Sequence, residues 1–312
     1  MKKLTVSHLL GIKYLQIEDL KLIFETATHF KEIINRPIKK VPSLRDITIA
    51  NLFFENSTRT KLSFELAEKR LSADVLNISV GQSSIAKGET LTDTVKNILA
   101  MKVDMIVIRH PYPGAAHFLA KQVNSCIINA GDGTHEHPSQ ALLDTYSLID
   151  KLGDLRGKKI AILGDILHSR VALSNIYALR MLGANIKLCA PKSLLPKHID
   201  SLGVTLSDDL MYVLNWCDAV NVLRVQNERM DINYFPSSRE YNQNFGINKE
   251  CIEKLRKKIF ILHPGPINRG VEISSEVADS DNAIILDQVE NGVAIRMAII
   301  YLLGSQLNIS TQ

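Results

Sequence analysis

Short apolar runs and longer amphipathic segments alternate along the chain. Buried strands are predicted at residues 47–54, 74–79, 104–108, 126–129, 159–163 and 186–190, where apolar and β-branched side chains predominate. Helical spacing is found at residues 60–71, 91–101, 115–122, 137–152, 169–182 and 293–303. Residues 210–216, 219–223 and 259–263 continue the same pattern. This rhythm favours parallel sheets with helices on both faces.

A turn-rich break at residues 153–157 follows the long helix and divides the pattern in two. Two open sheets joined near residues 137–155 fit better than one barrel, because the long helix would bridge two separate crevices. We therefore predict an α/β fold with two doubly wound parallel-sheet domains, residues 1–139 with 293–312 and residues 140–292. The apolar C-terminal helix would pack back on the first domain. Residues 225–250, rich in Asn, Arg, Tyr and Ser, are predicted to form a long functional loop.

Composition narrows the class of protein. The 312 residues are enough for two domains, and 37 Lys and Arg against 33 Asp and Glu leave a net charge of +4. That charge is too small to indicate a nucleic-acid or membrane partner. The four cysteines form no Cys-x-x-Cys pair, which argues against a disulfide framework or a structural zinc site. No signal peptide or long apolar run is visible, so we expect a cytoplasmic protein.

The first predicted strand ends in a polar cluster, Ser57-Thr58-Arg59-Thr60. Ligands of open α/β sheets gather at such carboxyl ends of strands. Ser57 or Thr58 can cap the following helix, and an ordinary helix cap is the simpler interpretation of a Ser-Thr pair. Arg59 is the unusual feature, because a cation in the first turn opposes the helix dipole unless an anion binds there. The cluster therefore indicates a phosphate-binding site.

Three more arginines, Arg109, Arg170 and Arg224, follow other predicted strands. One such arginine would most simply be a solvated charge or an ion pair. Four of them indicate substrates with several negative charges, lodged between two domains. Lys87 is a candidate fifth cation, although a surface lysine is its simpler interpretation. His135 and His137 lack a third ligand at suitable spacing and do not predict a metal site.

The motifs together resemble those of the aspartate carbamoyltransferase family over essentially the whole chain. Ser57-Thr58-Arg59-Thr60 resembles the family's carbamoyl-phosphate motif, and His137-Pro138-Ser139-Gln140 its His-Pro-Thr/Ser-Gln. Arg224-Val225-Gln226 and His263-Pro264-Gly265-Pro266 resemble the aspartate branch, whereas the ornithine branch would carry a His-Cys-Leu-Pro element. The resemblance implies the transcarbamoylase fold. It also implies transfer of a carbamoyl group from carbamoyl phosphate to L-aspartate, in pyrimidine synthesis.

The resemblance also implies a role for each matching residue. Carbamoyl phosphate would be held by Ser57, Thr58, Arg59, Thr60, Arg109, His137, Gln140, Gly265 and Pro266. Aspartate would be bound by Lys87, Arg170, Arg224 and Gln226. Ser83 and Lys87 would reach the active site of a neighbouring subunit, which makes the catalytic unit a homotrimer with shared sites. Arg59, Thr60, Arg109 and His137 would be catalytic.

The chemistry implied by these roles needs no metal and no cofactor, because carbamoyl phosphate is already activated. Positioning and electrostatics would supply the rate. No Asp or Glu of these motifs is well placed as a general base, so we expect the departing phosphate to accept the proton. Some positions depart from the commoner pattern: Leu167 stands where some relatives have lysine, Ser139 replaces threonine, and Gly265 replaces a larger apolar residue.

Three questions stay open at this point. Residues 168–170 and 268–270 resemble bacterial enzymes that act as bare trimers, but regulatory or pyrimidine-pathway chains remain possible partners. A carbamoyltransferase for another amino acid is a rival function, weakened by two sites suited to carboxylates at Arg170 and Arg224. A non-catalytic scaffold homologue is the second rival. It would be expected to have lost Arg59, Arg109, His137 or Arg224, and all four are present.

Overall fold

The computed structural model describes residues 2–79, 89–226 and 237–307. The chain divides into two compact units, unit 1 with residues 1–142 and 290–312 and unit 2 with residues 143–289. The functional boundaries expected above, at 139/140 and 292/293, stay a prediction. Within the described residues, no helix is both long and apolar enough to cross a membrane.

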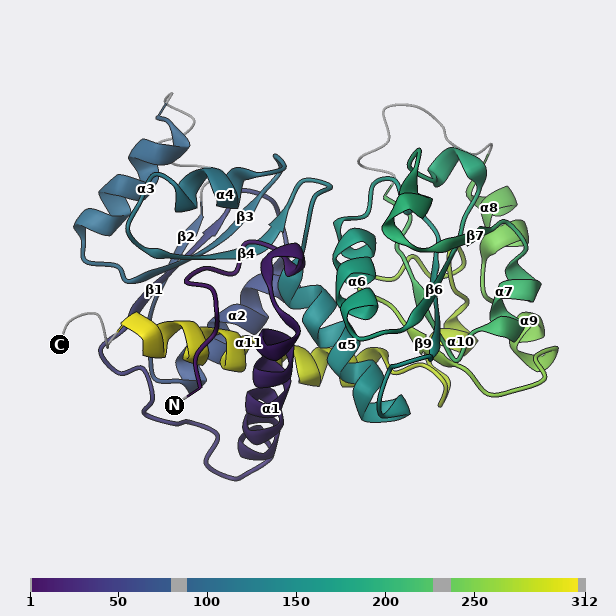
Figure 1. Ribbon diagram of the computed structural model, residues 1–312, viewed down its shortest axis with the longest axis horizontal. Coiled ribbons are helices and arrows are strands. Elements are labelled where there is room, and N and C mark those ends of the chain that lie inside the picture. The colour runs from purple at the N-terminus through teal and green to yellow at the C-terminus, as the bar shows by residue number, and fades with distance from the viewer. Residues whose placement is uncertain (1, 80–88, 227–236, 308–312) are drawn as a thin grey trace. The chain divides into compact units, whose positions relative to one another are not determined.

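Unit 1 is built on a four-stranded parallel sheet in the order β2-β1-β3-β4. Its strands are β1 (Thr48–Phe53), β2 (Asp74–Ser79), β3 (Met105–His110) and β4 (Cys126–Asp132). Its helices are η1 (Ile12–Tyr14), α1 (Ile17–Ile34), α2 (Thr58–Arg70), α3 (Leu91–Ala100) and α4 (Ala115–Ala120), joined by the first residues of α5 (Pro138–Leu152) and most of α11 (Ile285–Leu307). In Figure 1, α3 and α4 lie on one side of this sheet and α1, α2 and α11 on the other.

Helices pack on both faces of this sheet, through an apolar cluster on one side and through contacts of Arg296 on the other. Val95 and Ile98 of α3 and Leu119 of α4 join β-strand residues in one buried cluster. On the other side, the guanidinium of Arg296 in α11 donates to Ser63 Oγ of α2 at 2.9 Å and lies over the Phe64 ring, 5.0 Å from its centroid. The C-terminal helix therefore packs on the first unit, as the sequence predicts, although it begins at Ile285 rather than at residue 293.

Unit 2 holds a five-stranded parallel sheet in the order β7-β6-β5-β8-β9. Its strands are β5 (Lys159–Leu163), β6 (Asn185–Cys189), β7 (Thr205–Ser207), β8 (Ala219–Val222) and β9 (Phe260–Leu262). Its helices, besides the remainder of α5, are α6 (Arg170–Met181), η4 (Lys192–Leu194), η5 (Ile199–Leu202), α7 (Leu210–Trp216), α8 (Ser238–Phe245), α9 (Lys249–Glu253) and α10 (Ser275–Ala278).

The two faces of this second sheet belong to different buried clusters. Ile160 and Ile162 of β5 point into one cluster, whereas Ala161 and Leu163 point into the other. Both faces of a strand are thus buried, which is the reason for its continuous apolar sequence. The prediction of two doubly wound parallel sheets is confirmed.

The prediction of one long loop over residues 225–250 is wrong for its second half. Residues 238–245 form α8, and residues 249–253 form α9. Ser237 Oγ accepts a hydrogen bond from the Glu240 N–H at 3.1 Å at the start of α8, and Tyr241 is 2% exposed. Buried Tyr241 and partly buried Phe245 anchor a helix whose other six residues are polar, so its composition resembles that of a loop. Residues 227–236 lie outside the described residues.

Candidate functional site

The strand order of unit 1 reverses between β1 and β3, and ligands of open parallel sheets bind at the carboxyl ends of strands at such a point. The chain leaves β1 toward Ser57 and the first turn of α2, while Arg109 lies near the end of β3. Phe53, the last residue of β1, is in register with Arg109. The polar cluster after β1 and Arg109 therefore lie at the same edge of the sheet.

The start of α2 differs from an ordinary capped helix. Ser57 occupies the N-cap position, but its side chain makes no capping hydrogen bond, and the first turn holds no acidic residue. Of the two predicted caps, Ser57 does stand at the N-cap position and Thr58 is already helical, but the capping hydrogen bond expected from Ser57 Oγ is not made. Thr58 and Arg59 are exposed, and Thr60 is buried. An uncapped N-terminus with a cation in its first turn is suited to a phosphate.

Contacts with Glu55 and with the Ala130 carbonyl help to hold Arg109 at the carboxyl end of β3. Its Nε lies 3.2 Å from Glu55 Oε2, and its Nη1 donates to the Ala130 carbonyl at 3.3 Å. The Arg109 side chain is 12% exposed. These contacts fix a positive group beside the start of α2, where a preorganised donor is effective.

His137 and Gln140 lie at the start of α5, which follows β4. They are 4% and 7% exposed. The His137 carbonyl accepts hydrogen bonds from the Gln140 N–H at 3.0 Å and the Ala141 N–H at 3.2 Å, so His137 stands at the N-terminal boundary of the helix. The carboxyl ends of β1, β3 and β4 thus supply all the candidate carbamoyl-phosphate residues of unit 1.

The turn between β4 and α5 is organised by Asp132, which is 1% exposed. Its carboxylate accepts hydrogen bonds from the Gly114 N–H at 2.6 Å and the Asn129 amide at 2.8 Å, and lies 3.1 Å from His135 Nδ1. Burial would raise the pKa of Asp132, but the bonds from His135, Asn129 and Gly114 outweigh it and lower that pKa. The hydrogen bond between His135 and Asp132 in turn raises the pKa of His135.

Glu136, between the two histidines, has a separate structural function. It is fully buried, and its carboxylate accepts a hydrogen bond from the Ile12 N–H at 2.8 Å, at the start of η1. His135 pairs with Asp132, and His137 opens α5. The structure therefore does not join His135 and His137 in one site.

In unit 2 the strand order reverses between β5 and β8. Arg170, the first residue of α6, is 3% exposed and follows the N-cap Ser169, whose Oγ accepts from the Ala172 N–H at 3.2 Å. Arg224 and Gln226 follow β8. The three predicted aspartate-binding residues of this unit therefore lie at the loops that flank its own reversal point.

Asp165 connects these two loops. It is fully buried, and one carboxylate oxygen accepts from the His168 N–H at 3.1 Å and lies 2.8 Å from His168 Nδ1. The other oxygen accepts from the Gln226 N–H at 3.3 Å. The carboxylate thus holds Gln226 against the turn that leads to Arg170.

Asp165→Asn is expected to raise KM for aspartate about tenfold or more, with carbamoyl-phosphate affinity unchanged, because an amide N–H₂ would face one of these donors. Steady-state kinetics with each substrate varied in turn would measure the split. Asp154→Asn is the matched control, since Asp154 lies in an exposed turn, where it accepts a hydrogen bond from the Arg156 N–H. A loss of affinity for both substrates alike would contradict the assignment.

The turn after β9 is built around His263, which is 2% exposed. Its Nδ1 accepts from the Gly265 N–H at 2.7 Å, which leaves Nε2 to donate to Glu272 Oε1 at 3.1 Å. The Gly265–Pro266 peptide is cis, and Gly265 has a φ of +60°. The Asn268 amide donates to the Val225 carbonyl at 3.2 Å, which ties this turn to the loop of Arg224.

Ser83 and Lys87 lie outside the described residues. The sequence interpretation did not identify the organising roles of Glu55, Asp132, Asp165 and His263. Three of these are carboxylates at the carboxyl end of a strand, close in sequence or register to an arginine or histidine. That juxtaposition is the signal by which they could have been found.

Two family models match this chain. The carbamoyl-P binding domain of aspartate/ornithine carbamoyltransferase matches residues 7–150, and the Asp/Orn binding domain of the same family matches residues 156–303. The aspartate carbamoyltransferase catalytic subunit of Christiangramia forsetii is 71% identical over 305 residues, which cover 98% of each chain. The chain belongs to the aspartate carbamoyltransferase family. The catalytic subunit of Flavobacterium johnsoniae is 70% identical, over 98% of this chain and all of the relative.

Solved structures of this family have the same fold. The catalytic subunit of M. jannaschii aspartate transcarbamoylase superposes with a TM-score of 0.83 at 35% identity, over 96% of this chain and 99% of that one. Aspartate transcarbamoylase from Trypanosoma cruzi in complex with carbamoyl phosphate gives a TM-score of 0.85 at 30% identity, over 94% of each chain. This protein is thus similar to members of the aspartate carbamoyltransferase family in sequence and in fold.

Proposed function

We propose that the strand-end residues of the two units carry out aspartate carbamoyl transfer. The chain is an enzyme that transfers the carbamoyl group of carbamoyl phosphate to the amine of L-aspartate. The products are N-carbamoyl-L-aspartate and phosphate, in de novo pyrimidine biosynthesis. The observation that supports our residue assignment most is the position of the four arginines. Arg59 and Arg109 flank the reversal point of one sheet, and Arg170 and Arg224 flank that of the other.

Carbamoyl phosphate is assigned to unit 1 and to the turn after β9. The phosphate binds the first turn of α2 through Ser57, Thr58, Arg59 and Thr60. The carbamoyl group is held by Arg109, His137 and Gln140 and by the carbonyls of Gly265 and Pro266. The uncapped start of α2 and the fixed guanidinium of Arg109 support these roles.

Aspartate is assigned to Arg170, Arg224, Gln226 and Lys87, because two carboxylates need several positive groups. Its neutral amine attacks the carbamoyl carbon, and the tetrahedral oxyanion is stabilised by Arg109, His137 and Thr58. Arg59 and the N-terminus of α2 stabilise the charge that grows on the departing phosphate. The carboxylate of Glu55 pairs with Arg109, and that of Asp165 accepts hydrogen bonds from His168 and Gln226. Neither is assigned as a general base, and the departing phosphate accepts the proton that the amine loses.

A product assay tests this function. The protein is mixed with carbamoyl phosphate and either L-aspartate or L-ornithine, and the carbamoylated amino acid is quantified. We expect carbamoyl aspartate and no citrulline above background. Absence of product with aspartate would exclude the proposed function, and turnover of ornithine would favour the rival branch of the family.

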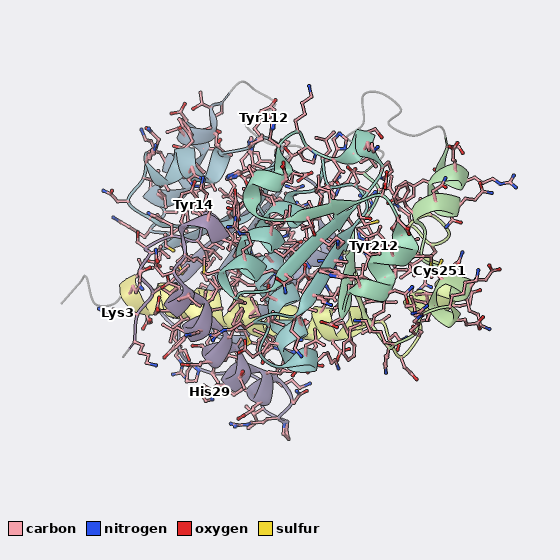
Figure 2. All side chains as sticks on the ribbon, turned by 45° about the vertical axis from the view of Figure 1, so that its right-hand side comes forward. Lys3, Tyr14, His29, Tyr112, Tyr212 and Cys251 are labelled. Atoms are coloured by element: carbon pink, nitrogen blue, oxygen red, sulfur yellow. The ribbon has the colours of Figure 1, made fainter. Side chains whose placement is uncertain are left out.

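We also propose a homotrimer in which Ser83 and Lys87 serve the site of a neighbouring subunit. Exposed apolar side chains on unit 1 support association. Tyr112 (Figure 2) is 72% exposed and Phe118 51% exposed. Both line a hollow of about 400 Å³, as does Phe54. Apolar patches of this kind are typical of interaction sites. Regulatory or pyrimidine-pathway chains remain further candidate partners. The four unpaired cysteines support a reducing, cytoplasmic setting.

Subunit mixing tests the shared site. Lys87→Ala and Arg59→Ala proteins are each expected to be nearly inactive. Mixed and reassembled, they should regain activity, because some sites would receive an intact Arg59 from one chain and an intact Lys87 from another. Light scattering should give about three times the 34.8 kDa of one chain. A monomeric mass, or no recovery in a reassembled mixture, would contradict sharing.

A further inference from the structure

The ring of His117, on α4, is half-buried, but both of its nitrogens lie out of contact with solvent. Both its ring nitrogens are buried, and neither has a hydrogen-bond partner among the described residues. The ring does contact two others, with centroids 4.8 Å from the Tyr14 ring and 5.7 Å from the His135 ring. A neutral imidazole has one N–H donor and one acceptor nitrogen, so burying both unsatisfied is unfavourable. This cost calls for a partner that the described part of the chain does not supply.

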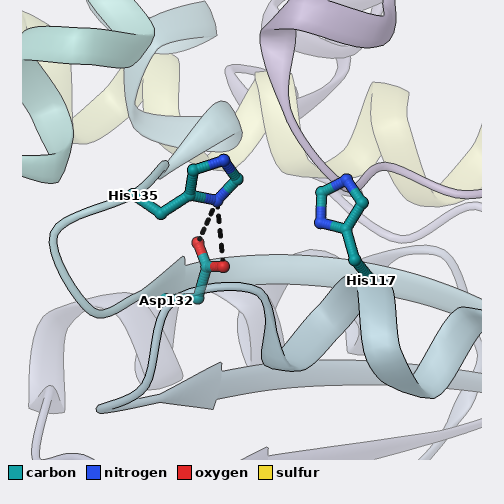
Figure 3. Close-up of side chains that lie close together, drawn as sticks. All are labelled: His117, Asp132 and His135. Carbon is teal, nitrogen blue, oxygen red and sulfur yellow. Dashed lines mark hydrogen bonds and ion pairs between the residues drawn. The ribbon is translucent and has the colours of Figure 1, made fainter.

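Two potential metal ligands face this ring. Figure 3 shows one ring nitrogen of His117 directed toward the Asp132 carboxylate and the His135 ring, which hydrogen-bond to each other. One ligand atom from each of His117, Asp132 and His135 can be chosen so that all three lie within 4.8 Å of one another. All three residues belong to unit 1, from α4, the end of β4 and the turn that follows.

Asp132 is the fixed member of the group. Its carboxylate is held by the Gly114 N–H, the Asn129 amide and the Glu136 N–H, at 2.6, 2.8 and 3.1 Å. Carboxylates that ligate metals are commonly oriented by such hydrogen bonds. The His135 side chain is 29% exposed, which gives an ion a path from solvent and leaves room for water.

Two imidazoles and one carboxylate are the donor set that Zn²⁺ and similar divalent ions prefer. Ligand atoms around a tetrahedral zinc ion lie about 3.3–3.5 Å apart, since the bonds are about 2.0–2.2 Å long. Asp132 and His135 are already at 3.1 Å, so the ion requires mainly an inward rotation of His117. Fourteen residues (118–131) separate His117 from Asp132, so a search for ligands at short sequence spacing does not find this group.

We propose that His117, Asp132 and His135 form a binding site for one divalent transition-metal ion of the Zn²⁺ class, with water completing its coordination. The ion would join α4 to the turn between β4 and α5. Its role would be to stabilise this part of unit 1, two residues before His137. The proposal does not depend on the carbamoyl-transfer function, because neither His117 nor His135 contributes to the assigned substrate sites.

Titration with Zn²⁺ alone tests the site in the full-length chain after treatment with a chelator. Isothermal calorimetry is expected to give one ion per chain. His117→Gln and His135→Gln should each weaken binding at least about tenfold, because each removes one of three protein ligands. His29→Gln is the matched control: His29 lies on the outer face of α1 (Figure 2) and should leave affinity unchanged. No saturable binding, or binding unaltered by His117→Gln, would overturn the proposal.

Two further measurements keep the test decisive even if a variant folds poorly. Co²⁺ bound to the unmodified protein should give the visible spectrum of a four- or five-coordinate ion with nitrogen and oxygen ligands. A thiolate charge-transfer band would instead place the ion at a cysteine and overturn the proposal. Zn²⁺ should raise Tm of the unmodified and His29→Gln proteins but not that of His117→Gln, since an ion that binds only the folded state stabilises it. An equal shift in all three would also contradict the site.

Discussion

Arg59→Ala is expected to lower kcat for carbamoyl transfer to aspartate by about 10²–10³-fold or more, which corresponds to about 3–4 kcal/mol of transition-state stabilisation. Arg59 lies in the first turn of α2, where the Ser57 side chain makes no capping hydrogen bond and the turn itself holds no acidic residue. Its proposed partner, the phosphate, gains charge as the carbamoyl group leaves. The effect should therefore be larger in kcat than in the affinity for carbamoyl phosphate.

Folding should be preserved in this variant because Arg59 is exposed. Circular dichroism and the thermal midpoint are expected to match those of the unmodified protein. Arg36→Ala is the control for loss of one positive charge, since Arg36 is exposed and lies 3.9 Å from Glu32. An Arg59→Ala enzyme with kcat within about threefold of the unmodified protein would remove Arg59 from the mechanism.

Glu68→Gln is expected to stabilise the protein in mildly alkaline solution. Glu68 is fully buried in α2, and Oε2 accepts a hydrogen bond from the Asn51 amide at 2.7 Å. Burial raises the pKa of Glu68 from 4.5 to about 8, although the bond from Asn51 opposes the shift. The folded protein therefore keeps this proton over a range in which the unfolded chain has lost it.

The sign of the pH dependence follows from this difference in pKa. Below pH 4.5 both states are protonated, and Glu68 contributes no pH dependence. As pH rises from 4.5 to about 8, the folded state is destabilised relative to the unfolded state, by on the order of 5 kcal/mol in total. Above about pH 8 this loss of folding stability stays constant. Glutamine has a similar shape and does not titrate, so the variant should lack this loss.

Urea unfolding at several pH values between 5 and 8.5 measures the effect. The free energy of unfolding of Glu68→Gln, relative to the unmodified protein, should increase steadily with pH. Glu65→Gln is the control one turn earlier in the same helix, where Lys69 lies 2.6 Å away and lowers the pKa of Glu65. That variant should retain the pH dependence caused by Glu68. Parallel pH curves for Glu68→Gln and the unmodified protein would contradict the account.

Local patterning was sufficient for most of the elements. Residues 160–163 are continuously apolar because both faces of β5 are covered there, and the predicted strand, 159–163, matches the observed one. The start of α2 and the end of β4 were harder to predict. Helix α2 begins two residues before the predicted start, and β4 extends to Asp132, because Asn129 and Asp132 are polar but buried and hydrogen-bonded.

Side-chain partners depend on strand order, which the sequence does not specify locally. Arg109 and the start of α2 come together only because β1 and β3 are neighbours. The connection of Gln226 to Asp165 likewise requires β5 beside β8. For the same reason the sequence sets His135 beside His137, its neighbour along the chain, whereas His117 and Asp132 are the residues that it meets in space.

The central claim is a division of labour, in which Arg59 serves carbamoyl phosphate and Arg224 serves aspartate. Calorimetric titration of carbamoyl phosphate, without aspartate, into the unmodified protein, Arg59→Ala and Arg224→Ala tests it most directly. Arg59→Ala should bind at least about tenfold more weakly, because a charge-assisted contact is lost. Arg224→Ala should bind like the unmodified protein while its KM for aspartate rises. Equal losses of carbamoyl-phosphate affinity in the two variants, or a loss confined to Arg224→Ala, would contradict the account.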